Sequence, residues 1–191
     1  MGLFYYMKLL NIDNYELKVA DEAFLVKPIR DLFEKDESPH KEEFYSWMSY
    51  MYFMIDPRSS YNYIVDEKER AQTIIEQEGL KKSFKPSKEL KAAMDVYRKL
   101  VTTASSELLA DSIVAISNVR KVLKSINFDA LEEKDKVNAL KTTASVVAMI
   151  PKLVKDLSEA EKAVNKEIEE SGRARGGNQK TILEDGLDLF A

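Results

Sequence analysis

Two aspartates and a lysine form the pattern in this sequence that could most plausibly support catalysis. Asp56 is followed ten residues later by Asp66, and Lys68 stands two positions beyond that. Two carboxylates readily hold Mg²⁺, and a nearby lysine stabilises the negative charge that develops when a phosphodiester is cleaved. The spacing therefore supports one hypothesis of a metal-dependent nuclease that uses Asp56, Asp66 and Lys68.

A structural interpretation explains the same residues without chemistry. Asp66 followed by Glu69 matches a capping box at the start of a helix, which would end near Gly79.

His40 is the single histidine and the chain has no cysteine, so the usual zinc sites are excluded. We therefore expect no catalytic residue, no metal site and no cofactor, and we expect that the chain is not an enzyme.

The composition indicates a helical protein. Of 191 residues, 45% are hydrophobic and 32% are charged, and there are only six glycines and five prolines. The 29 basic and 33 acidic residues give a net charge of −4, which argues against a general nucleic-acid-binding protein. No run of about 18 apolar residues is present, so we expect no membrane span.

An aromatic-rich stretch, residues 44–63, contains eight of the eighteen aromatic residues. Ser38 and Pro39 predict a helix start, and the helix would run to Ile55. One stripe of this helix should be core: Phe44, Trp47, Met48, Met51, Tyr52 and Ile55. Tyrosine and arginine are enriched in interfaces. We therefore expect a contact surface for another subunit made of Tyr45, Tyr50, Phe53, Arg58, Tyr61 and Tyr63.

The second half of the chain predicts a long antiparallel helical hairpin. One helix, capped by Ser87, could reach about Ile126, a length of roughly 57 Å if it is unbroken. A second should begin near Asp135 and kink or break at Pro151. Its core stripe would be Val137, Leu140, Ala144, Val147, Ile150, Val154, Leu157, Ala160, Val164 and Ile168. Residues 84–126 carry eight basic and four acidic side chains, and residues 127–171 carry seven and ten, so the two helices should attract each other.

The overall expectation is an all-α fold with flexible terminal arms. We divide it into an N-terminal arm with a short helix (1–37), an aromatic-rich helical region (38–82), the hairpin (83–170) and a C-terminal tail (171–191). Within the arm, the weak alternation of residues 15–19 is compatible with a short strand or an extended arm, and Pro28 is expected to begin or kink a helix that reaches Lys35. The tail should be a flexible tether followed by a docking peptide that uses Ile182, Leu183, Leu187, Leu189 and Phe190.

A family resemblance is carried by about thirty residues. They comprise Met51 to Arg70, which reads Met-Tyr-Phe-Met-Ile-Asp-Pro-Arg-Ser-Ser-Tyr-Asn-Tyr-Ile-Val-Asp-Glu-Lys-Glu-Arg, and the continuation from Ile74 to Leu80. This stretch resembles a small structural protein of crAss-like bacteriophages, short-tailed phages that infect gut Bacteroidales. The resemblance implies a virion ring protein, the head-to-tail adaptor (connector) between portal and tail.

The same resemblance implies partners and a location. It implies a homo-oligomeric ring of twelve copies that contacts the portal protein and a tail or second ring protein. DNA would pass through the ring without specific binding, and the protein would reside at the portal vertex (neck) of the virion after synthesis in the host cytoplasm. An internal, ejected cargo protein of the virion and the metal-dependent nuclease stay open as alternatives.

Overall fold

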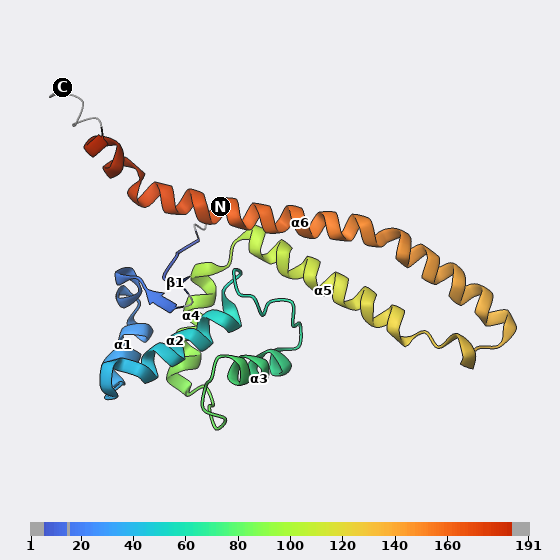
Figure 1. Ribbon diagram of the computed structural model, residues 1–191, viewed down its shortest axis with the longest axis horizontal. Helices are drawn as coiled ribbons and strands as arrows, with labels where there is room; N and C mark the ends of the chain where they lie inside the picture. The colour runs from blue at the N-terminus through green and yellow to red at the C-terminus, as the bar shows by residue number, and fades with distance from the viewer. Residues whose placement is uncertain (1–5, 15, 185–191) are drawn as a thin grey trace.

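The computed structural model of the chain describes residues 6–14 and 16–184. The structure is 73% helical, and in its described part it has six α-helices and one small two-stranded sheet, so the all-α prediction is confirmed. Figure 1 shows two parts: a body of short helices and a long arm of two paired helices that projects from it.

The body contains the elements from the N-terminus to α4. Strands β1 (Leu10–Asp13) and β2 (Glu16–Val19) form an antiparallel pair in which Leu10 lies opposite Val19. The helices are α1 (Lys27–Lys35), α2 (Glu42–Ile55), α3 (Glu67–Gln77) and α4 (Lys88–Val101), with 3₁₀ turns at Asp21–Leu25 and Pro39–Lys41. The short strand and the helix ending at Lys35 agree with the sequence-based expectation.

Helix α2 is the centre of the body. It contacts α3, α4 and β2, and seven of its fourteen residues are buried, including Tyr50, Phe53 and Met54, which lie off the predicted core stripe. Phe44, Met48 and Met51 are each 0% exposed, and full burial of such a side chain contributes about 1.5–3 kcal/mol. The helix is buried on most sides, which explains why its sequence is apolar nearly all round.

The start of α2 differs from the prediction. Ser38 does not cap a helix that begins at Pro39; a 3₁₀ turn comes first, and His40 and Lys41 have left-handed φ values of 55° and 60°. Buried Asp36 accepts the N–H groups of Ser38 and Phe44 with its two oxygens, each at 2.7 Å, and the predicted capping residue Ser38 accepts the N–H of Glu43 with its hydroxyl at 3.2 Å. Burial alone would raise the pKa of Asp36, but these hydrogen bonds outweigh burial and lower it.

Helix α3 begins and ends as the sequence indicates. Asp66 caps it by accepting the N–H groups of Lys68 and Glu69 at 3.0 and 2.8 Å. Gly79 follows its last turn with φ +67°, a left-handed conformation in which glycine costs little.

The predicted unbroken helix from Ser87 to Ile126 is wrong. It is two helices, α4 and α5 (Ala104–Ser125), which are bent by 106° at residues 102–103. Thr103 is extended and forms a reciprocal capping box with Ser106: each backbone N–H donates to the other residue's hydroxyl, at 2.7 and 3.2 Å. This local cap competes with continuation of the helix. Helix α4 packs on α1 and α2, so the hairpin begins at residue 104 and not at residue 83.

Helices α5 and α6 (Glu133–Glu184) form the antiparallel hairpin that the sequence predicts (Figure 1). Glu167 of α6 ties the hairpin to the bend, because its carboxylate accepts hydrogen bonds from Thr103 Oγ1 at 2.5 Å and Ser105 Oγ at 2.6 Å. Of the kink or break expected at Pro151, the break is absent, because Pro151 lies inside the continuous α6, which Figure 1 shows as one helix with a gradual bend.

The expected tether at residues 171–180 is also wrong, because α6 continues through it to Glu184. Gly176 and Gly177 each cost a helix about 1 kcal/mol relative to alanine. Extending an existing helix needs no new nucleus, so this cost does not force the helix to end there.

One further property concerns membranes. Within the described part of the chain, no single helix has the length and apolar composition needed to cross a bilayer; α4 and α5 meet that test only when taken together as a bent pair.

Candidate functional site

The aromatic contact surface expected from the sequence is mostly inside the body. Tyr50, Phe53 and Tyr61 are 3%, 9% and 6% exposed, so their assignment to a contact surface is wrong. The loop that follows α2 folds back over it, which brings the rings of Phe53 and Tyr61 to 5.2 Å in an edge-to-face arrangement. Tyr45 and Tyr63, at 43% and 68% exposed, are the two members available to a partner.

Arg58, the remaining member of that set, is held by a buried ion pair. Its Nε and Nη2 atoms each lie 2.9 Å from an oxygen of Asp56, which is 0% exposed. The guanidinium also donates to Asn11 Oδ1 and to the carbonyl of Leu10, and it lies 5.3 Å from the centres of the Tyr6 and Tyr52 rings. Arg58 therefore joins the N-terminal segment to the end of α2, and its guanidinium is engaged within the body.

The carboxylate of Asp56 is fully occupied. Its Oδ2 accepts the hydroxyls of Tyr6 at 2.8 Å and Tyr97 at 2.5 Å, in addition to the bonds from Arg58. Burial, reinforced by the charge of Asp56, raises the pKa of both tyrosines well above the ordinary value. The same two causes raise the pKa of Tyr52 to about 12. The cluster fastens β1, α2 and α4 to one another.

This geometry removes the basis of the nuclease hypothesis. Asp56 has no free oxygen and no solvent access, whereas Asp66 is an exposed cap at the start of α3. The backbone N–H of Glu69 is the main cause of the lowered pKa of Asp66. In the described part of the chain, no three histidine, cysteine, aspartate or glutamate side chains converge as a metal would require.

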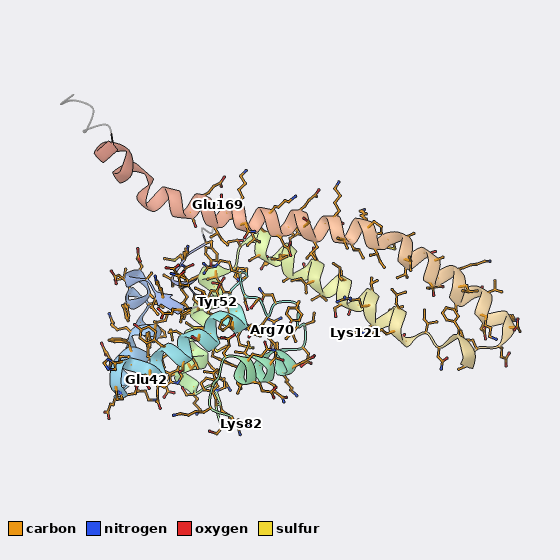
Figure 2. All side chains as sticks on the ribbon, viewed as in Figure 1. Glu42, Tyr52, Arg70, Lys82, Lys121 and Glu169 are labelled. Carbon is orange, nitrogen blue, oxygen red and sulfur yellow. The ribbon has the colours of Figure 1, made fainter. Side chains whose placement is uncertain are left out.

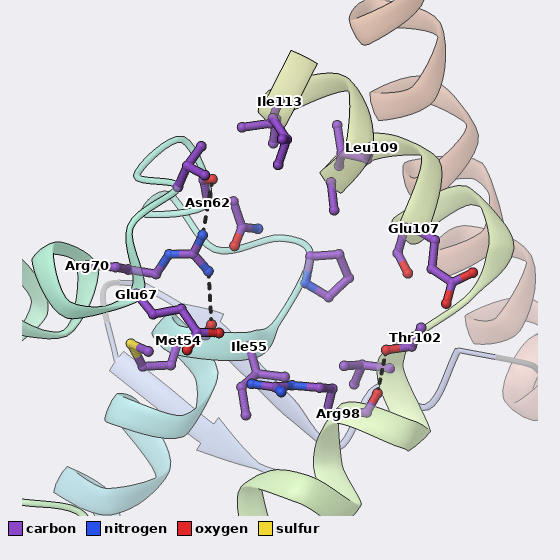
Figure 3. Close-up of a pocket in the computed structure, with 16 residues that line it drawn as sticks. Met54, Ile55, Asn62, Glu67, Arg70, Arg98, Thr102, Glu107, Leu109 and Ile113 are labelled. Atoms are coloured by element: carbon purple, nitrogen blue, oxygen red, sulfur yellow. Dashed lines mark hydrogen bonds between the residues drawn. The ribbon is translucent and has the colours of Figure 1, made fainter. Parts of the chain in front are cut away.

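A cleft of about 270 Å³ lies between the body and the start of α5 (Figure 3). Arg70 on one wall donates to the carbonyls of Ile64 at 2.8 Å and Met54 at 3.2 Å, and burial lowers its pKa. Leu109 and Ile113 of α5 form the opposite wall. Because backbone carbonyls already occupy Arg70, we interpret the cleft as the junction between body and hairpin.

The hairpin has one stripe of α6 that faces α5, which we call the seam. Its positions are buried or half-buried and repeat at alternating steps of three and four residues: Lys136, Ala139, Thr143, Val146, Ile150, Leu153, Leu157, Ala160 and Val164. This is the spacing of a left-handed coiled coil. Ala160 and Val164 pack against Leu109 of α5, and together they form a small core separate from that of the body.

A second stripe of α6, which we call the outer stripe, is exposed to solvent. It consists of Val137, Leu140, Ala144, Val147, Pro151 and Val154. The sequence-based prediction assigned all of these residues except Pro151 to the core. It is wrong for these five, because in each case the preceding residue is the one that belongs to the seam. In the first turns of α6 the prediction took Leu140 and Ala144 as buried, whereas the preceding residues, Ala139 and Thr143, are the less exposed positions.

The predicted docking peptide lies at the edge of what the structure describes. Ile182 and Leu183 fall within α6, but their side chains are outside the described part of the structure. Leu187, Leu189 and Phe190 are outside the described residues altogether. Their docking role stays a prediction.

The chain was compared with family models, curated proteins and solved structures. No match was found in any of the three. The resemblance to crAss-like phage ring proteins stays a prediction, and the functional argument below depends on the molecule's own surfaces.

Proposed function

We propose that this protein is a structural virion subunit of a short-tailed, crAss-like phage that assembles into a ring at the portal vertex, between portal and tail. The observation that carries the proposal is the apolar surface of the hairpin. Eight large hydrophobic side chains of the hairpin are 41–58% exposed: Leu108, Val114, Val122, Val137, Leu140, Val147, Met149 and Val154. Three of them are on α5 and five on α6, and exposed apolar side chains in such number are typical of a surface that another chain covers.

The shape of the molecule supports an assembly role. The body has its own aromatic core and holds the hairpin as an arm that reaches well beyond it (Figure 2). Such an arm can cross a subunit boundary, whereas the body supplies a rigid base. The two buried carboxylates of the body, Asp36 and Asp56, are occupied by internal hydrogen bonds and stabilise its fold.

The resemblance supplies the biological setting, and the partners follow from it: sibling subunits, the portal protein and a tail or second ring protein. An excess of acidic over basic residues suits a ring through which DNA passes without being bound.

Native mass spectrometry and electron microscopy of the purified full-length chain, with and without the portal protein, test this proposal. We expect a closed ring of about twelve subunits that binds portal. A stable monomer without affinity for portal or tail proteins would refute the proposal and favour an ejected internal protein.

A further inference from the structure

The outer stripe has the geometry of a second helix-packing surface. Each of its six positions follows a seam position by one residue, which places it about 100° around the helix. From Val137 to Val154 it extends roughly 26 Å along α6. Val137, Leu140, Val147 and Val154 are 50–58% exposed. A helix with two adjacent heptad stripes is suited to pack against two neighbouring helices, but the hairpin supplies only one.

The composition of the two stripes supports the same conclusion. Between residues 136 and 147 the seam contains Lys136, Ala139, Thr143 and Val146, whereas the outer stripe contains Val137, Leu140, Ala144 and Val147 and is therefore the more apolar of the two over this length. The hydroxyl of Thr143 is buried and has no hydrogen-bond partner in the described structure. If α6 had only α5 to contact, turning the outer stripe inward would bury more apolar surface, at about 0.8 kcal/mol per CH₂ group. The outer stripe is therefore suited to a partner outside the chain.

The charges of the hairpin indicate which partner fits. The half of the hairpin far from the body, residues 119–152, is called the tip half and carries seven basic and four acidic side chains. The base half, residues 104–118 and 153–171, carries three basic and eight acidic side chains. Figure 2 labels one member of each charge excess, Lys121 toward the tip and Glu169 near the body.

These opposite charges are not neutralised by pairing between the two halves. The ion pairs along α6 are local, such as Lys155 with Glu159. Arg120, Lys121 and Lys124 form no ion pair within the described residues, and the charge of Lys121 acts at longer range on Asp66 of the body, whose pKa it helps to lower. Two hairpins side by side with tips aligned would place like charges together. If instead the tip of one hairpin lies beside the base of the other, the basic half of the first faces the acidic half of the second.

We propose that the outer stripe docks on the hairpin of a second copy of this chain, with the tip half of one copy lying along the base half of the next. The inference rests on the proposed assembly role and names the surface that performs it. Apolar contact along the outer stripe supplies the affinity, and the tip-to-base charge pairing fixes the direction.

The first test places charge in the outer stripe of the full-length chain. We expect Leu140→Glu with Val147→Glu to weaken self-association at least about tenfold in sedimentation velocity, because both side chains would be desolvated at the contact. Both positions are exposed in the free chain, so circular dichroism should show an unchanged fold. Asn138→Glu with Ser145→Glu is the matched control, since these exposed positions on the same helix turns lie outside the outer stripe.

The second test reverses charges. A tip variant carries Arg120→Glu, Lys121→Glu and Lys124→Glu, and a base variant carries Glu159→Lys, Glu161→Lys and Glu170→Lys. Each variant alone should associate more weakly than the native chain, and the chain that carries all six substitutions should recover most of the loss.

The outcomes separate this inference from the proposed function. If the native chain forms rings and the outer-stripe variant forms the same rings, or if the six-fold variant recovers nothing, the inference is wrong and the ring stands. If association depends on the stripe but stops at two copies, the inference holds and the ring is refuted. A native chain that remains monomeric at every concentration overturns both.

Discussion

Asp56→Asn should destabilise the body by about 3–5 kcal/mol, because it breaks a buried ion pair by removing one partner only. Asparagine keeps the shape of the side chain but not its charge. Arg58, whose side chain is 15% exposed, would remain charged beside a neutral group. The hydroxyls of Tyr6 and Tyr97 would also have to share a weaker acceptor.

The structure places the expected loss toward the lower end of that range, at about 3 kcal/mol. Arg58 keeps its hydrogen bonds to Asn11 and to the carbonyl of Leu10 after the substitution. It also keeps its position over the rings of Tyr6 and Tyr52, each contact being worth on the order of 0.5–2 kcal/mol.

Urea unfolding at one fixed protein concentration measures this loss, with the fluorescence of the single tryptophan, Trp47, reporting on α2. Adding Arg58→Met to Asp56→Asn should recover at least about 1 kcal/mol, because the unpaired charge is then removed. Glu43→Gln is the control, since it breaks an exposed ion pair with Lys81 that is worth at most about 1 kcal/mol. A loss below about 1 kcal/mol for Asp56→Asn would show that this cluster does not hold the body together.

Three further predictions concern single positions or groups. Thr143→Val should raise the free energy of unfolding by about 1 kcal/mol in a urea titration, because it removes a buried hydroxyl without a partner; an unchanged value would show that the hydroxyl is satisfied. Gly79→Ala should cost about 1–2 kcal/mol in the same assay, since its φ of +67° strains any residue with a Cβ, although open space surrounds it. Stability should fall as the pH rises above about 10, because tyrosines in the unfolded chain then lose protons while Tyr6 and Tyr97 keep theirs; thermal melts of Tyr97→Phe should show a shallower decline.

Local signals in the sequence were sufficient for much of the architecture. The cap at Asp66, the left-handed Gly79 and the start of α4 at Ser87 were predicted correctly, because each depends on residues within a few positions. The hairpin was predictable from helical periodicity and from the opposite charges of its two segments. The hydroxyl-rich residues 102–106 also favour a helix cap. The apolar periodicity continues across them, however, so the sequence pattern did not indicate the bend between α4 and α5.

The candidate site was harder to predict, because its residues are defined by long-range contacts. No local pattern pairs Asp56 with Tyr6, fifty positions earlier, or with Tyr97, forty-one positions later. Arg58 and Tyr61 have the composition of an interface, and only the fold shows that they are enclosed by the body.

The sequence alone determined that the chain is helical, that its core is aromatic and that two long helices pair, because periodicity and composition are properties of neighbouring residues. The tertiary structure decided which face of each helix is buried. On α6 the two apolar stripes differ by a single position, so rotating the helix by about 100° exchanges core for surface. That rotation is set by the packing of α6 against α5, for example of Ala160 and Val164 against Leu109, a contact between segments far apart in the chain.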